Sequence, residues 1–192
     1  MSAGSDALLI VDVQRDFLPG GALAVPEGDQ VVPVLASVSG YFSRQRLPVI
    51  ASRDWHPPDH CSFQAQGGPW PPHCVAGTPG AELDPGLRLP PDTLIVDKAG
   101  TSDKDAYSAF EGTELDHRLK RQGVRRLFIG GLVTEYCVLN TAADAIKNGY
   151  EVVLINDAIR AIDRAEGRRA IDTLRASSAT VIESGELLDE EN

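Results

Sequence analysis

The sequence predicts an α/β fold, a three-layer α/β/α domain around a central, mostly parallel sheet of six strands. Six short runs rich in β-branched residues are almost continuously apolar, which is typical of strands covered on both faces. Helical patterns lie between most of these runs, and this alternation predicts a parallel sheet with helices on both faces. The predicted strands span residues 7–13, 48–53, 93–97, 126–130, 151–156 and 179–183. The strand order that we expect is the Rossmann-like order 3-2-1-4-5-6.

The helices and the extent of the domain follow from periodicity and length. Apolar residues at helical spacing predict helices at residues 31–42, from Thr113 onward, at 138–146 with an end at Asn148-Gly149, and at 165–176. A length of 192 residues favours one domain, residues 1–192, with a core at about 7–183. We expect the acidic tail after Ser184 to be frayed.

One long segment, residues 54–91, fits neither a strand nor a helix. It is rich in proline and glycine, shows no periodicity and holds three of the four histidines. Because an irregular loop of this length in a compact domain is usually functional, we expect it to contribute to a site.

Composition excludes several classes of partner. The net charge is −10, from 28 acidic and 18 basic residues, whereas nucleic-acid binding requires a positive field. The same charge disfavours anionic membrane surfaces.

The first apolar run lacks a preceding basic segment and is too short to span a bilayer, so we expect neither a signal peptide nor a membrane span. Three cysteines cannot all pair, which indicates a reducing, cytoplasmic compartment. A homo-oligomer is compatible with the sequence.

Ionisable residues follow the predicted strands. Asp12, Asp54 and Lys98 come at or just after the ends of the first, second and third strands, and the fourth runs into a turn before Cys137. Ligands of open parallel sheets bind beyond the carboxyl ends of the strands, where the strand order reverses. The expected order would therefore place all four side chains along one rim.

Cys137 has the setting of a nucleophile, at the start of a predicted helix. The partial positive charge and free N–H groups of a helix N-terminus stabilise a thiolate and can receive an oxyanion. Asp12 can take the thiol proton and later protonate a leaving ammonia, while Lys98 can hold Asp12 in place. The alternative is that Cys137 is a small buried residue and that Asp12 and Lys98 form a structural ion pair.

The run from Asp54 to His60, with His73 beyond it, predicts a metal site. One carboxylate and two or three imidazoles suit Zn²⁺, Mn²⁺ or Fe²⁺, and an extended segment would point Asp54 and His56 to the same side. Three roles stay open for His60: a fourth metal ligand, a hydrogen-bond partner of a ligand, or a surface residue. One alternative is that these histidines only form hydrogen bonds with the backbone. Another is a structural zinc site made of His56, His60, Cys61 and Cys74, although the spacing of these residues fits no common zinc module.

Aromatic residues near these positions are candidates for a binding site. Phe17 and Trp70 lie in irregular segments, where they can form the walls of a pocket for a flat ring. For Trp55, core packing is as plausible as ligand contact. His117 lies on a polar helical stretch and is expected to be solvated. The Gly130-Gly131 pair lacks the full dinucleotide-binding pattern and gives only a weak signal.

Several motifs occur together in an order that matches a known family. They are Val11-Asp12-Val13-Gln14-Arg15-Asp16-Phe17; Asp54-Trp55-His56-Pro57 with His60, Ser62 and Phe63; Trp70 and His73-Cys74-Val75-Ala76-Gly77-Thr78; Lys98 with Ala106-Tyr107-Ser108-Ala109-Phe110; and Gly131-Leu132-Val133-Thr134-Glu135-Tyr136-Cys137-Val138. Over residues 7–183 the chain resembles the nicotinamidases, also called pyrazinamidases, of the isochorismatase-like cysteine hydrolases.

The resemblance implies an activity and a role for each site residue. It implies hydrolysis of nicotinamide to nicotinic acid and ammonia through a cysteine thioester, a place in NAD salvage, and cleavage of pyrazinamide. One divalent ion, zinc before manganese or iron, would position the pyridine ring. The implied residues are Asp12, Lys98 and Cys137 for catalysis; Asp54, His56 and His73 for the metal, with His60 a ligand in some relatives only; Phe17, Trp70 and Val133 for the substrate; and the N–H groups of Thr134 and Cys137 for the oxyanion, beside a cis peptide bond between Val133 and Thr134.

The sequence departs from the usual residues of this family at two positions, and three competing functions are still to be considered. Relatives usually have Ala where Val133 stands and often Asp where Glu135 stands, which affects the shape of the pocket more than the chemistry. The first competitor is another hydrolase of the same fold, such as an isochorismatase, which does not need the Asp-His metal loop, or a carbamoyl-amide hydrolase. The second is a catalytically silent binding module. The third, a thiol redox protein, has no CxxC motif to support it.

Overall fold

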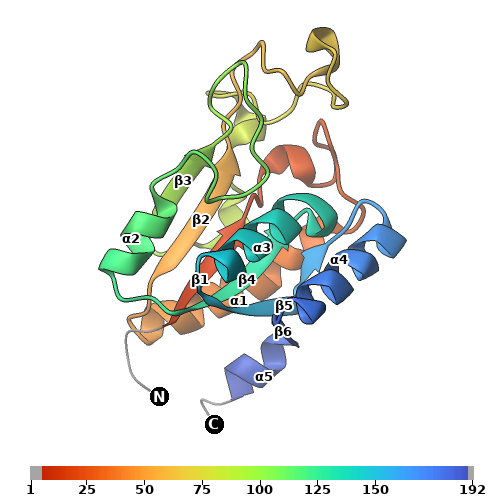
Figure 1. The fold of residues 1–192 in the computed structure, drawn as a ribbon. Coiled ribbons are helices and arrows are strands. Elements are labelled where there is room, and N and C mark those ends of the chain that lie inside the picture. The colour runs from red at the N-terminus through yellow and green to blue at the C-terminus, as the bar shows by residue number, and fades with distance from the viewer. Residues whose placement is uncertain (1–5, 190–192) are drawn as a thin grey trace.

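The computed structural model describes residues 6–189, and its strands form one entirely parallel six-stranded sheet (Figure 1). The strand order is β3-β2-β1-β4-β5-β6, which confirms the predicted fold class and order. The strands are β1 (Asp6–Val11), β2 (Val49–Asp54), β3 (Leu94–Lys98), β4 (Arg126–Leu132), β5 (Glu151–Arg160) and β6 (Thr180–Ile182).

Helices cover both faces of the sheet, because the central strands are apolar on both sides. In β1, Leu8 and Ile10 pack in one core and Leu9 and Val11 in the other, and all four are fully buried. One core includes residues of α1 (Val31–Arg44) and α5 (Ser184–Leu188), and the other includes residues of α2 (Leu115–Arg121), α3 (Leu139–Lys147) and α4 (Arg164–Ala176). None of the helices in residues 6–189 is long and apolar enough to cross a membrane.

Several predicted boundaries shift, and one prediction was wrong. The first strand ends at Val11 rather than Val13, because Asp12 has a left-handed φ of 48° that ends the extended run. Residues after Ser184 were expected to be frayed, yet Ser184–Leu188 form a helix; residues 190–192 of this tail lie outside the described residues. Glu183 and Glu186 cap its first turn reciprocally, and Leu187 is buried in the core, which explains the difference.

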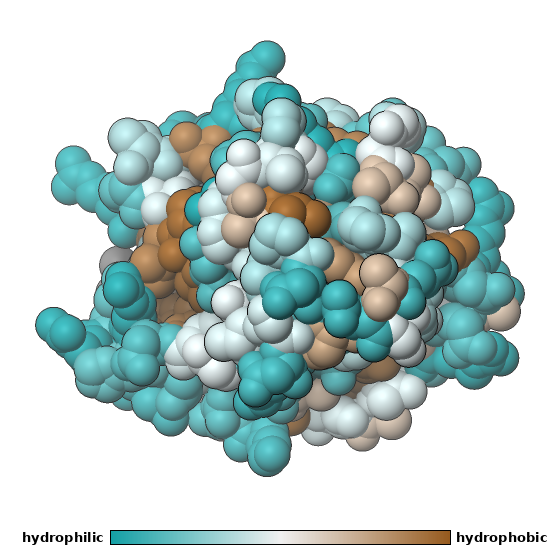
Figure 2. Space-filling view, turned by 90° about the horizontal axis from the view of Figure 1, so that it is seen from above, coloured by the Kyte–Doolittle hydropathy of each residue, from teal (hydrophilic) through white to brown (hydrophobic). Residues whose placement is uncertain are grey.

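The segment between β2 and β3 has neither a regular strand nor an α-helix, as predicted. It contains only short turns of 3₁₀ helix, at Gln64–Gln66, Pro79–Ala81 and Pro85–Leu87. The segment rises beyond the carboxyl ends of the strands, at the top of Figure 1. Seen from that end, the molecular surface mixes hydrophilic residues with hydrophobic ones, some of them recessed between hydrophilic projections (Figure 2).

Candidate active site

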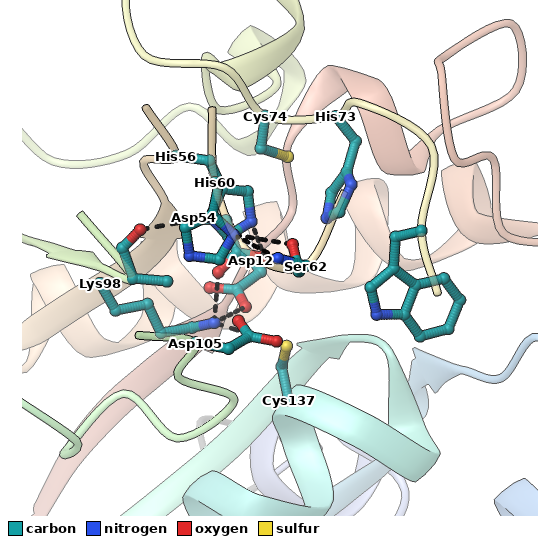
Figure 3. Close-up of polar contacts among 12 residues, drawn as sticks. Asp12, Asp54, His56, His60, Ser62, His73, Cys74, Lys98, Asp105 and Cys137 are labelled. Atoms are coloured by element: carbon teal, nitrogen blue, oxygen red, sulfur yellow. Dashed lines mark hydrogen bonds and ion pairs between the residues drawn. The ribbon is translucent and has the colours of Figure 1, made fainter. Parts of the chain in front are cut away.

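The carboxyl ends of four neighbouring strands bring the predicted ionisable residues together. Asp54 and Lys98 are paired residues at the ends of β2 and β3, and Asp12 directly follows β1. Cys137 lies beyond β4, and its sulfur points toward the two aspartates and Lys98 (Figure 3). One ligand atom each of Asp12, Asp54 and Cys137 lies within 4.8 Å of the others. All four side chains are buried.

A glycine lets the strands that carry these residues approach closely. Gly131 pairs with Val11 in the register of β1 and β4, and its φ is +131°. A Cβ atom at position 131 would lie 2.0 Å from the Val11 carbonyl oxygen. Only glycine can therefore occupy this position without separating the strands that lead to Asp12 and to Cys137.

Lys98 lies between the two carboxylates and the thiol. Its ammonium donates to Asp54 Oδ1 at 2.5 Å, to the Ala106 carbonyl at 3.0 Å and to Cys137 Sγ at 3.5 Å. Its Nζ also lies 3.0 Å from Asp12 Oδ2. Burial alone would lower the pKa of Lys98, but the carboxylates of Asp12 and Asp54 outweigh burial and raise it, so the side chain stays charged.

Asp12 and Asp54 have opposite electrostatic environments despite their proximity. Burial raises the pKa of Asp12, against the opposing attraction of Lys98. Burial acts in the same direction on Asp54, but Lys98 and His56 outweigh it and hold the pKa of this carboxyl below its usual range. Asp12 is therefore the better proton acceptor, while Asp54 stays ionised.

We expected Cys137 at the start of a regular helix, but the structure places it elsewhere. It lies in a π-helical turn, Thr134–Val138, in which the Val138 N–H donates to the Val133 carbonyl, and α3 begins only after this turn. We expected a stabilised thiolate. Instead, burial raises the pKa of the Cys137 thiol, and although Lys98 opposes this effect, the nearby carboxylates reinforce it. The thiol is therefore protonated at rest and needs a base to become a nucleophile.

A cis peptide bond precedes this turn, one residue earlier than expected. The resemblance implied a cis bond between Val133 and Thr134, whereas the structure has it between Leu132 and Val133. Strand β4 remains paired with β5 as far as Leu132, so the cis bond falls directly at the end of the strand. Val133 directly precedes the turn that carries Cys137 and Thr134 begins it, and both residues are buried.

The three predicted metal ligands lie together. Ligand atoms of Asp54, His56 and His73 are all within 4.8 Å of one another, and the three residues are buried. His56 Nδ1 lies 3.2 Å from the Ala99 carbonyl and His73 Nδ1 lies 2.8 Å from the Pro71 carbonyl. A carbonyl only accepts, so both Nδ1 atoms carry the proton and each Nε2 keeps its lone pair for a metal. This donor set fits a divalent ion such as zinc.

His60 lies next to this group but does not join it. Its ring contacts that of His56, with 4.1 Å between centroids and an angle of 30° between the ring planes. Its Nδ1 contacts the Ser62 hydroxyl at 2.7 Å and its Nε2 contacts the Lys104 carbonyl at 3.2 Å, so both ring nitrogens have other partners. Within residues 6–189, neither Cys61 nor Cys74 belongs to a group of potential metal ligands, and both thiols are free.

The two aromatic residues predicted as pocket walls contact different parts of the site, one the metal ligands and the other the turn that carries Cys137. Phe17 packs against the ring of His73, with 5.6 Å between centroids. Trp70 meets Tyr136 edge-on at 5.2 Å, and its Nε1 donates to the Tyr107 hydroxyl at 3.2 Å. Tyr107 and Tyr136 were not predicted as site residues. The position of Tyr136, directly before Cys137, was a signal that could have found it.

Trp55 has a packing role instead. The Arg53 guanidinium lies over its ring, 3.8 Å from the centroid, and the indole packs against one of the two hydrophobic cores. His117 is exposed, with its Nδ1 3.9 Å from Glu114 Oε2, as expected for a solvated residue.

Gln14 was also missed as a site residue, although it holds the chain around Asp54. Its Oε1 accepts the Asp54 N–H at 2.8 Å, and its Nε2 donates to the carbonyls of Asp54 and Ala81, also at 2.8 Å. The amide is fully buried, and it bonds the backbone of Asp54 at the end of β2 as the backbone of a neighbouring strand would. These partners lie 40 and 67 residues away in the sequence, so no local pattern reveals them.

Comparisons with known proteins place these features in context. A family model for the isochorismatase domain matches residues 6–186. The chain is 37% identical to the nicotinamidase of Escherichia coli, over 91% of this chain and 93% of that protein. The crystal structure of pyrazinamidase of Pyrococcus horikoshii in complex with zinc superposes with a TM-score of 0.90 at 46% identity, covering 93% of this chain and 99% of that one. PnC1 from L. infantum in complex with nicotinate superposes with a TM-score of 0.88 at 38% identity, over 96% of each chain.

Proposed function

We propose, from the premise that this chain belongs to the isochorismatase family, that it hydrolyses nicotinamide to nicotinic acid and ammonia. One observation carries the proposal: a thiol, a proton-accepting carboxylate and a charged ammonium are buried together at Cys137, Asp12 and Lys98. Relatives named for nicotinamidase and pyrazinamidase activity support this choice of amide.

The residues of the chain can carry both halves of the reaction. Asp12 accepts the thiol proton, and the sulfur of Cys137 bonds to the amide carbon. The C–N bond then breaks, ammonia leaves with the proton from Asp12, and a thioester remains. Water attacks the thioester while Asp12 accepts its proton, and that proton returns to the departing sulfur. Lys98 stabilises the sulfur anion, and the N–H groups of Thr134 and Cys137 receive the oxyanion.

The neighbouring donor set supports one divalent ion, held by Asp54, His56 and His73, with zinc as the first candidate. When bound, the ion would position the substrate by binding the ring nitrogen of nicotinamide. Phe17 and Trp70 would flank the ring, and Val133 would line the site near the reacting carbon. Pyrazinamide keeps a ring nitrogen in the same place and would also be a substrate.

Two further points follow from the proposed chemistry. The product, nicotinic acid, is a precursor that a pyridine-nucleotide salvage route would consume. The three free thiols of Cys61, Cys74 and Cys137 support a reducing, cytoplasmic setting, because an oxidising one would threaten the nucleophile.

Ammonia release from nicotinamide tests the proposal directly. The purified protein, loaded with zinc, should release ammonia and nicotinic acid in equal amounts. Cys137→Ala should release none, whereas Cys61→Ser, a matched change of a free cysteine, should keep the wild-type rate. Mass spectrometry of quenched turnover should find the acyl group on Cys137. A wild-type protein that binds zinc but releases no ammonia would refute the proposed substrate.

A further inference from the structure

The hydrogen bonds of Lys98 leave the orientation of Asp12 unexplained. An ammonium has three protons. Lys98 directs its three hydrogen bonds to Asp54, the Ala106 carbonyl and Cys137 Sγ. Asp12 Oδ2 lies 3.0 Å from Nζ but accepts no hydrogen bond from any residue in the described part of the chain. Lys98 therefore attracts Asp12 by charge without fixing the direction of its carboxylate.

Ser52 supplies the missing hydrogen bond. Its hydroxyl donates to Asp12 Oδ1 at 2.7 Å, and both side chains are fully buried. The Ser52 carbonyl also accepts the Asp12 N–H at 3.2 Å, so one residue of β2 holds both the backbone and the side chain of Asp12. Asp12 needs such support because it has a left-handed φ of 48° at the end of β1.

We propose that Ser52 is a positioning residue that assigns separate roles to the two carboxylate oxygens of Asp12. Oδ1 is held by the Ser52 hydroxyl, and Oδ2 is thereby left without a hydrogen bond, 3.0 Å from the Lys98 Nζ atom that also donates to Cys137 Sγ. Oδ2 is then the oxygen that accepts the thiol proton and returns it to ammonia. This inference rests on the proposed function, because it deepens the role of Asp12 in that reaction.

The position of Ser52 separates it from residues that touch the substrate. It lies within strand β2, two residues before Asp54, and its neighbours in the sheet register are Val11 and Val96. Loss of its hydroxyl should therefore impair proton transfer without altering how nicotinamide is held. The expected signature is a lower kcat at an almost unchanged KM.

Ser39 offers a matched control elsewhere in the molecule. It is also a fully buried serine, on α1, and its hydroxyl has no hydrogen-bond partner in the described structure. Ser39→Ala removes the same atom from a buried site that the reaction does not use. Comparison with Ser52→Ala therefore isolates the contact with Asp12.

The test measures nicotinamide hydrolysis by the zinc-loaded wild type and by Ser52→Ala, Ser52→Thr and Ser39→Ala, after circular dichroism has shown that each is folded. Ser52→Ala should lower kcat by about 10- to 100-fold, the range expected for a lost hydrogen bond to a charged group, with KM within about twofold of wild type. Ser52→Thr restores the hydroxyl and should recover most of kcat, and Ser39→Ala should match the wild type.

Each other outcome has a definite meaning. If the wild type hydrolyses nicotinamide and Ser52→Ala keeps its kcat within about twofold, a change too small for the lost bond, Ser52 does not position Asp12. If a folded Ser52→Thr is as slow as Ser52→Ala, packing rather than the hydroxyl causes the loss, and the inference is again wrong. If the wild type itself does not hydrolyse nicotinamide, the proposed function fails instead.

Discussion

Replacement of Gln14 by leucine should weaken both the fold and the metal site. The leucine side chain is similar in size but cannot replace the three hydrogen bonds to the backbone groups of Asp54 and Ala81. Each buried backbone group left without a partner costs about 1–3 kcal/mol. The free energy of unfolding should therefore fall by at least about 3 kcal/mol, a large part of the usual 5–15 kcal/mol total, roughly, for a domain.

Urea denaturation of the metal-free protein measures this loss. Gln66→Leu, at an exposed position in a short turn, is the control and should change the free energy of unfolding by about 0.5 kcal/mol or less. Zinc affinity, measured by competition with a chelator, should fall by about 10- to 100-fold in Gln14→Leu, because the backbone of Asp54 is no longer fixed. A Gln14→Leu protein with wild-type stability and wild-type zinc affinity would refute this reasoning.

The remaining predictions concern the nucleophile, the metal ligands and the substrate. Cys137→Ala should still bind nicotinamide, as isothermal titration calorimetry can show, because in the proposed reaction the residue acts on the carbonyl rather than the ring; loss of binding would mean that it also holds the substrate. His73→Ala and Asp54→Ala should each lower the metal content found by elemental analysis, whereas Cys74→Ser should leave it unchanged. His60→Ala should retain most of the metal, since both ring nitrogens bond elsewhere; a loss as complete as that in His73→Ala would make it a ligand. Benzamide lacks the ring nitrogen, so its kcat/KM should be lower by about 10⁴-fold, and a rate close to that of nicotinamide would show that the metal does not hold the ring.

Features that depend on strand order could be predicted from the sequence. Parallel strands end at one edge, so the order alone brought Asp12, Asp54, Lys98 and Cys137 to a common rim. The two-residue spacing of Asp54 and His56 likewise predicted a shared direction. These inferences needed only the identity of the strands and not their exact ends.

Features that depend on contacts between distant segments could not be predicted. Ser52 lies 40 residues from Asp12, and Tyr107 lies 37 residues from Trp70, so nothing in the local pattern pairs them. The division of partners around Lys98 was missed for the same reason, because distances to four groups decide which of them it can bond. The burial that raises the pKa of Cys137 is also a property of the packed structure rather than of the sequence near it.

The close approach at Gly131 constrains how the enzyme could be redesigned. A saturation library at this position should return glycine alone among active clones, since any side chain would collide with the backbone of β1. Trp70 lies on the irregular segment, is only partly buried and makes a T-shaped contact with Tyr136, the residue before Cys137. Under the proposed function, variation there should alter the surroundings of the substrate without disturbing the close contact between β1 and β4. Directed evolution toward new amides should therefore select substitutions in the irregular segment, while the residues at the close contact between β1 and β4 stay unchanged.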